Sequence, residues 1–203
     1  CAGSAQSTKN LADIAEITRN DFAFYKHILN VSLVNVDNSI SAVSDLSKVW
    51  KGTPNYWIQW KCTPTHFVLV GHNVKDNKEI FSKEWKNRMD ANRSLVHQYN
   101  DELYQAIFSK PSIFNSRIVF SGAAEWGVKK SVKEIYMVDF DGHNLQKITN
   151  HRGLALSPAF SPDNKKIIYS LIDSNKRIKN VALNEFDLLT RSSRVVSDKV
   201  GIN

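Results

Sequence analysis

Residues 117–121 read Arg-Ile-Val-Phe-Ser, and residues 166–170, 49 positions later, read Lys-Ile-Ile-Tyr-Ser. Each segment has the length and the β-branched and aromatic content of a short β-strand. A second set of positions repeats with a spacing of 48: Ile135 with Leu183, Asp139 with Asp187, Ile148 with Val196, and Thr149 with Ser197. A period near 48 with four short strands in each unit is typical of β-propeller blades. Chance similarity between two β-hairpins is the alternative.

Turn signals separate these predicted strands. Asp141-Gly142 follows residues 135–139, and Ser161-Pro162-Asp163-Asn164 precedes residues 166–170. We interpret both as turn formers, because Pro presets φ while Gly and Asn tolerate positive φ. A blade has two apolar faces that only neighbouring blades can cover, and a propeller closes with about 4–8 blades. Residues 118–203 supply fewer than two, so we expect a truncated, six-bladed propeller whose remaining blades follow residue 203.

Before Pro111 the pattern is different. Apolar side chains recur at helical spacing over residues 8–29 and again from Asp90 towards Pro111. Short strands are expected at residues 31–36, 66–71 and 79–85, and a short helix is expected from Pro54 through Trp57 and Trp60. The prediction is therefore an α+β chain in three parts. Residues 1–10 form a polar tether, residues 11–110 a small α/β domain, and residues 111–203 the first one to two blades of the propeller.

Composition excludes several classes of protein. Of the 203 residues, 42% are hydrophobic and 23% are charged, which excludes a fully disordered chain. No apolar run approaches the roughly 20 residues that a transmembrane helix needs. The net charge is +7, but no more than two Lys or Arg residues are adjacent, and no zinc-finger or RNA-binding signature occurs. Nucleic acid is therefore not expected as a partner, which leaves an acidic protein or solubility alone as the reason for the charge.

Motifs that carry chemistry are absent from the sequence. It contains no GxSxG, HExxH, P-loop or GxGxxG motif. The six histidines lack metal-ligand spacing, and the tryptophans at 50, 57, 60 and 85 are expected to pack in a core. We therefore predict no catalytic residues, no metal and no cofactor. The propeller part of a prolyl-oligopeptidase-type hydrolase remains an alternative, which would need a Ser-Asp-His set elsewhere.

Propeller geometry gathers basic residues on one face. The connection from an outermost strand to the next innermost strand, here residues 150–156, emerges there, together with loops between the two middle strands of each blade. Seven Lys or Arg residues are expected on this face, against Glu125 and Asp173. This face would dock a protein with an acidic surface, with leucines of the connection as apolar anchors; a solvated loop face is the alternative. The candidate binding residues are His151, Arg152, Gly153, Leu154, Ala155, Leu156, Lys129, Lys130, Lys176 and Arg177.

The same segments carry a family resemblance. Residues 133–142 (Lys-Glu-Ile-Tyr-Met-Val-Asp-Phe-Asp-Gly), residues 156–163 (Leu-Ser-Pro-Ala-Phe-Ser-Pro-Asp) and residues 166–170 resemble the propeller repeat of the TolB family. A helix with His97 and Asp101, followed by Ile-Phe-Asn-Ser-Arg-Ile-Val-Phe at residues 113–120, is similar to that family's junction between its α/β domain and first blade.

The resemblance implies a function. It implies a non-enzymatic periplasmic scaffold of the Tol-Pal system, which keeps the cell envelope coupled to peptidoglycan. A Pal-like lipoprotein would dock over the propeller opening, and residues 151–156 would form part of that contact. Other envelope proteins are further possible partners, and a TolB-like subunit of another envelope machine is the runner-up. TolA binding is not expected, because this chain reaches its first helix without the family's extended N-terminal segment.

The first residue suggests a lipid anchor. Cys1 is followed by the small residues Ala2, Gly3 and Ser4, as in bacterial lipoproteins after signal-peptide removal. In that class the cysteine carries several acyl chains, which give stable membrane binding where one chain would not. We therefore predict a periplasmic protein that touches the outer membrane only through a lipid on Cys1. The alternative is a chain that happens to begin at this residue.

Overall fold

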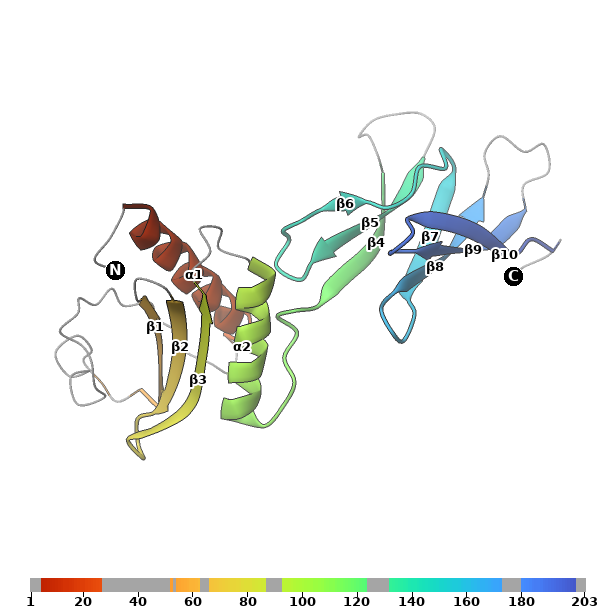
Figure 1. Cartoon of the computed structure of the whole chain (residues 1–203). Coiled ribbons are helices and arrows are strands. Elements are labelled where there is room, and N and C mark those ends of the chain that lie inside the picture. Colours follow the sequence, from red (N-terminus) through yellow and green to blue (C-terminus); the bar gives the residue numbers. More distant parts are fainter. Residues whose placement is uncertain are drawn as a thin grey trace. The chain divides into compact units, whose positions relative to one another are not determined.

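A computed structural model describes residues 5–26, 52, 54–62, 66–86, 93–123, 132–172 and 180–199. The chain divides into two compact units, Cys1–Asn115 and Ser116–Asn203. Within the described residues there are two helices and ten strands, so the predicted α+β class is confirmed (Figure 1). The strand expected at residues 31–36 lies outside the described residues. Neither helix in the described part of the chain is both long and apolar enough to cross a membrane.

The first unit packs two helices on a three-stranded sheet. Helix α1 spans Ala5–Ala23 and helix α2 spans Arg93–Phe108. Strands β1 (Tyr56–Cys62), β2 (His66–Asn73) and β3 (Lys78–Lys86) form an antiparallel sheet in the order β1-β2-β3. The apolar core joins both helices to the sheet through Ile14, Ile17, Phe67 and Val96, with Trp60 and Trp85 at its margin.

Most predictions for this unit are confirmed, with two corrections. Both long helices and the strands at residues 66–71 and 79–85 are present. Helix α1 begins at Ala5, so more than half of the segment expected as a tether is helical. The short helix expected from Pro54 is wrong, because the residues that follow form strand β1 and pair with β2 from Tyr56 to Cys62.

The second unit is entirely β in its described residues. Its strands are β4 (Arg117–Ala123), β5 (Lys133–Asp139), β6 (Gln146–Lys147), β7 (Leu154–Phe160), β8 (Lys166–Ile172), β9 (Val181–Asp187) and β10 (Ser192–Ser197). Strands β4–β6 pair antiparallel as one group, and strands β7–β10 as another. One parallel pairing, of Lys133 with Leu154, joins the groups. Strands β4, β5 and β6 match β8, β9 and β10, as the repeat predicts.

The two strand groups share an apolar core. Ile135, Met137 and Ile148 come from the first group and meet Ala155, Ile167, Tyr169 and Phe186 of the second. The strand order β10-β9-β8-β7-β5-β4 has two ends, so the described strands form no closed barrel. The predicted turns are present, with positive φ at Gly142 (86°) and Asn164 (56°).

The second group also has a face that points away from this core. The antiparallel register places Leu154, Leu156, Ile168, Ile172 and Leu183 on it, alternating with the core residues. We call this the open face. Ile168 is 37% exposed there, although it lies in the middle of the sheet. Within the described residues of the second unit no other sheet packs on the open face.

Candidate functional site

A short connection between β6 and β7 forms the centre of the candidate site. It comprises residues 150–153, and it lies at the end of the sheet where Ala123 pairs with Lys133 and Ile172 pairs with Val181. Lys133 and Arg152, which are both exposed, lie at this end of the sheet. Lys129, Lys130, Lys176 and Arg177 lie outside the described residues.

The structure shortens the predicted connection. Residues 150–156 were expected as a loop, but β7 begins at Leu154, because this segment pairs with β8 along its length. Ala155 is fully buried in the shared core and offers no surface. Leu154 and Leu156 are half-buried on the open face, and Gly153 is buried. Arg152 is the one candidate of the connection that is fully exposed in the described part of the site.

A buried carboxylate holds the connection in place. Glu134 is 0% exposed and accepts hydrogen bonds from the Thr149 hydroxyl (2.6 Å), the His151 N–H (3.1 Å) and the Arg152 N–H (2.8 Å). Thr149 in turn accepts a hydrogen bond from the Ile135 N–H at 2.9 Å. We call Glu134 with these three donors the carboxylate clamp. A buried carboxylate is stable only when its oxygens are bonded in this way.

The electrostatics of the clamp favour the ionised carboxylate. Burial alone would raise the pKa of Glu134, but hydrogen bonds from Thr149, Arg152 and His151 and the charge of Lys147 bring that pKa below its usual value. The carboxylate is therefore charged at neutral pH, and it contributes stability that is present above its unfolded pKa. That stability is lost as the pH falls through the lowered folded pKa.

A second contact fixes the connection from the other side. His151 Nε2 lies 2.6 Å from the hydroxyl oxygen of Tyr169, a fully buried residue of β8. The Lys133 N–H donates to the Gly153 carbonyl at 2.9 Å, where β5 and β7 meet. Residues 151–153 are therefore bonded to both strand groups, which makes the connection a rigid part of the sheet end.

The second group has no copy of the carboxylate clamp at the equivalent repeat positions. Ala182 stands where Glu134 stands in the first copy, and Ser197 stands in place of Thr149. Instead, the Asn180 side-chain amide donates to the carbonyls of Asp198 (2.6 Å) and Lys199 (3.2 Å). Each group therefore fixes the chain that leaves its last strand, the first through N–H groups and the second through carbonyl groups.

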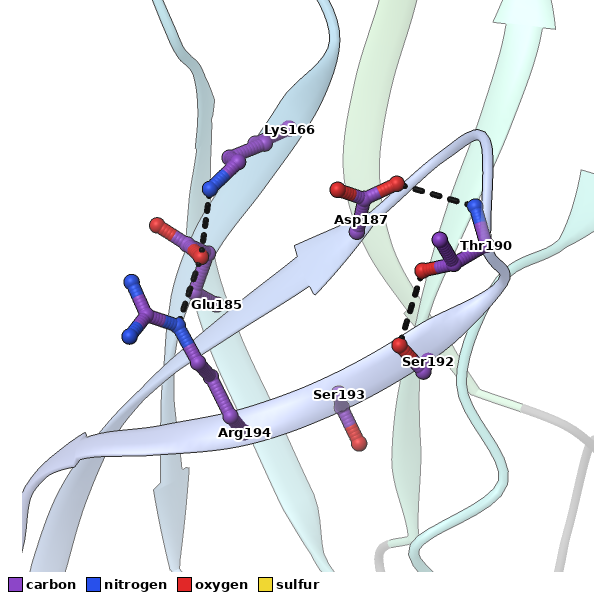
Figure 2. A pocket seen from close by; sticks show the side chains of 7 residues that line it. All are labelled: Lys166, Glu185, Asp187, Thr190, Ser192, Ser193 and Arg194. Atoms are coloured by element: carbon purple, nitrogen blue, oxygen red, sulfur yellow. Dashed lines mark hydrogen bonds and ion pairs between the residues drawn. The ribbon is translucent and has the colours of Figure 1, made fainter.

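A polar hollow occupies the opposite end of the second group (Figure 2). Lys166 Nζ and Arg194 Nε both donate to Glu185, at 3.0 and 2.8 Å, and Asp187 accepts from the Thr190 N–H at 2.9 Å. These pairs lower the pKa of Glu185 to about 2, chiefly through Arg194 and then Lys166. Glu185 is paired with Lys166 and Arg194, and Asp187 is hydrogen-bonded to the Thr190 backbone. Its lining residues are Lys166, Glu185, Asp187, Thr190, Ser192, Ser193 and Arg194.

This ion pair gives a measurable prediction. In an NMR titration of the native protein, the Glu185 carboxyl carbon should titrate with a midpoint near 2, against an ordinary 4.5. Arg194→Gln should move the midpoint upwards, because the first of its two cationic donors is lost. The stabilisation from this carboxylate is then present above its ordinary pKa and disappears as the pH approaches 2. A midpoint near 4.5 in the unaltered protein would contradict the geometry.

The first unit holds a buried polar network. Asp21 Oδ2 lies 2.8 Å from His97 Nδ1 and accepts a hydrogen bond from the Asn100 side-chain amide at 2.6 Å. Asn100 also bonds to Thr18, which accepts from the Trp60 indole N–H. The network joins α1, α2 and β1 in the core. Within the described residues, no three His, Cys, Asp or Glu side chains are placed to hold a metal ion.

Sequence reasoning missed Glu134. Residues 135, 137 and 139 show the period of a strand, and Glu134 falls on the alternate, outward phase. Its burial comes from the connection that folds over it, which depends on the β5–β6 register. The available signal was the repeat itself, in which a charged residue of the first copy aligns with Ala182 of the second.

Comparison with known proteins gives one consistent set of relatives. The chain is 32% identical over 96 residues to the Tol-Pal system protein TolB of Geobacter metallireducens, covering 47% of this chain and 21% of that protein. It is 35% identical over 97 residues to a protein TolB homolog of Chlorobium chlorochromatii, covering 48% and 21%. No family model matches the chain. The matched segments thus represent about a fifth of the length of these relatives.

A solved structure extends the likeness to the fold. The crystal structure of TolB from Acinetobacter baumannii matches with a TM-score of 0.69 and 22% sequence identity. The match covers 95% of this chain and 47% of that one. The likeness therefore includes both compact units, while the chain spans about half the length of the solved protein.

Proposed function

Because this chain is TolB-like in sequence and in fold, we propose that it is a non-enzymatic scaffold of the Tol-Pal type. It binds partner proteins, above all a Pal-like lipoprotein, in the periplasm and helps to maintain the cell envelope. The observation that carries the proposal is the fold likeness through both units, joined to sequence identity with proteins named for the Tol-Pal system. No catalytic step is part of this function.

The second unit supports the proposal as the start of a propeller. Its two strand groups cover one apolar face of each other, as adjacent blades do. The open face carries apolar side chains towards the end with Leu154 and Ile172, while Lys166 and Glu185 of the polar hollow lie at its other end. On the edge strand β4, Ile118 and Phe120 are 48% and 38% exposed. An exposed apolar sheet face and an exposed edge strand both favour further strands. We propose that residues 116–203 are the first one to two blades and that additional blades cover the open face.

The charge at the site supports an acidic partner. Arg152 and Lys133 are exposed at the sheet end. Basic groups speed the encounter with an acidic surface, and half-buried leucines beside them add apolar contact. Leu154, the first residue of β7 at this end of the sheet, is the nearest such leucine, while Leu156 lies further along the open face that additional blades would cover. A lipid on Cys1 would hold the scaffold at the outer membrane, where a lipoprotein partner also resides.

Isothermal titration calorimetry with a soluble, lipid-free Pal-type protein tests this function. The double variant Arg152→Glu with Leu154→Asp should weaken binding by at least about a hundredfold, because it reverses a charge and removes an apolar anchor. The matched control applies the same changes at the opposite end of the sheet, as Arg191→Glu with Leu189→Asp, and should bind like the unaltered protein. Equal affinity of all three proteins, or no binding by the unaltered one, would overturn the proposed function.

A further inference from the structure

We propose that Glu134 is the positioning residue of this site, which fixes the connection 150–153 so that the Arg152 side chain meets an acidic group of the partner. The inference rests on the proposed function and deepens it. It assigns separate roles to a buried carboxylate that never touches the partner and to an exposed guanidinium that does.

The backbone N–H groups of residues 151 and 152 and the carbonyl of residue 153 already form hydrogen bonds within the protein. The Glu134 carboxylate accepts hydrogen bonds from the N–H groups of His151 and Arg152, and the Gly153 carbonyl accepts one from the Lys133 N–H. An acidic group of a partner cannot use these N–H groups, because their hydrogens point to a buried carboxylate. The exposed Arg152 guanidinium is the group of the connection that can bind a carboxylate, in a two-pronged geometry that suits it.

The backbone of Arg152 shows that its conformation is imposed. Its φ is +56°, in the left-handed region that is unfavourable for a residue other than glycine. The hydrogen bond of 2.8 Å from its N–H to Glu134 offsets this cost and holds the residue in place. The direction in which the side chain leaves the sheet end is therefore set by Glu134.

The second strand group lacks this combination. Asn180 binds the carbonyls of Asp198 and Lys199, so the clamp there holds the opposite backbone groups. No carboxylate stands at the position of Glu134, since Ala182 replaces it. The two connections therefore present different chemistry on the same face, and the first one defines where an acidic group docks.

A double-mutant cycle tests the positioning role. Calorimetric affinity for the soluble, lipid-free Pal-type protein is measured for the full protein and for Glu134→Gln, Arg152→Asn and the double variant. Asparagine tolerates the left-handed conformation, so Arg152→Asn removes the guanidinium and keeps the backbone. Each single change should weaken binding by about tenfold. The double variant should bind no more weakly than Arg152→Asn alone, because Glu134 acts through Arg152. If the loss of affinity in the double variant equals the product of the losses in the two single variants, the inference is overturned.

Hydrogen exchange separates this inference from the proposed function. In Glu134→Gln, the amides of His151 and Arg152 should exchange at least about tenfold faster, while the core amides of Ile148 and Ile167 keep their rates. Unchanged exchange at residues 151 and 152 would overturn the positioning role whether or not the Pal-type protein binds. Failure of the unaltered protein to bind, with the exchange as expected, would overturn the function alone.

A milder variant covers the case in which Glu134→Gln does not fold. Thr149→Val removes one of the three donors and leaves both backbone bonds to the carboxylate. It should accelerate exchange at residues 151 and 152 by about threefold and weaken binding in the same direction. Exchange at these two amides that is no faster than in the unaltered protein would count against the clamp.

Discussion

Replacing Tyr169 with alanine should lower the free energy of unfolding of the second unit by about 3–5 kcal/mol. Tyr169 is fully buried and belongs to the core that joins the two strand groups. Its removal leaves a cavity between Ile135 and Met137 of the first group and Ile167 of the second. Chemical denaturation followed by circular dichroism measures the loss.

The matched variant Tyr169→Phe isolates the hydroxyl. It keeps the ring in the core and removes the 2.6 Å hydrogen bond to His151 Nε2. We expect a loss of about 1 kcal/mol, which is the usual net contribution of one hydrogen bond. If Tyr169→Ala and Tyr169→Phe cost the same, the shared core does not hold the two strand groups together.

Replacing Asp21 with alanine should destabilise the first unit by about 3 kcal/mol, because two buried polar groups lose their common acceptor. His97 and Asn100 are 2% and 0% exposed, and both lie within hydrogen-bond distance of Asp21 Oδ2. The unfolding midpoint in urea, followed by tryptophan fluorescence, reports the change, because Trp60 bonds to Thr18 of the same network.

Asp13 provides the control on the same helix. It is an exposed aspartate of α1, and Asp13→Ala should change the free energy of unfolding by no more than about 0.5 kcal/mol. A loss at Asp21 as small as the loss at Asp13 would show that the buried network does not stabilise the packing of α1 on α2.

The strands of the second unit could be predicted because two independent signals agree there. The repeat aligns residues 117–121 with 166–170, and Asp-Gly and Pro-Asp-Asn turns mark the boundaries. The structure places the aligned segments as β4 and β8, in equivalent positions of two strand groups. A repeated unit limits the alternatives for each copy, which a single apolar run cannot do.

Strand β1 could not be predicted from spacing. Trp57 and Trp60 are three positions apart, which suggested one face of a helix after Pro54. In the structure they lie on opposite faces of the sheet, with Trp57 stacked on His72 and Trp60 packed in the core against Trp85. Pairing with β2 decides the outcome, because aromatic residues pack well on a pleated sheet, whereas a short, isolated helix is only marginally stable.

The sequence predicted the end of the sheet at which residues 150–153 emerge, but not the contacts that hold them. The sequence indicated which end of the sheet gathers basic residues, since strand order alone determines where connections emerge. It could not indicate that Glu134 holds residues 151 and 152, because that contact depends on the register of β5 with β6. It also extended the connection through Leu156, because the boundary of β7 is set by pairing with β8.

Site-specific photocrosslinking tests directly whether the sheet end with residues 150–153 contacts the partner protein. A photoreactive phenylalanine derivative replaces Asn150, an exposed residue beside Arg152, or Leu189, which is 89% exposed at the opposite end of the sheet. The full protein is then irradiated with the soluble, lipid-free Pal-type protein. We expect a crosslink from position 150 and none from position 189. A crosslink from position 189 with none from position 150 would contradict this expectation.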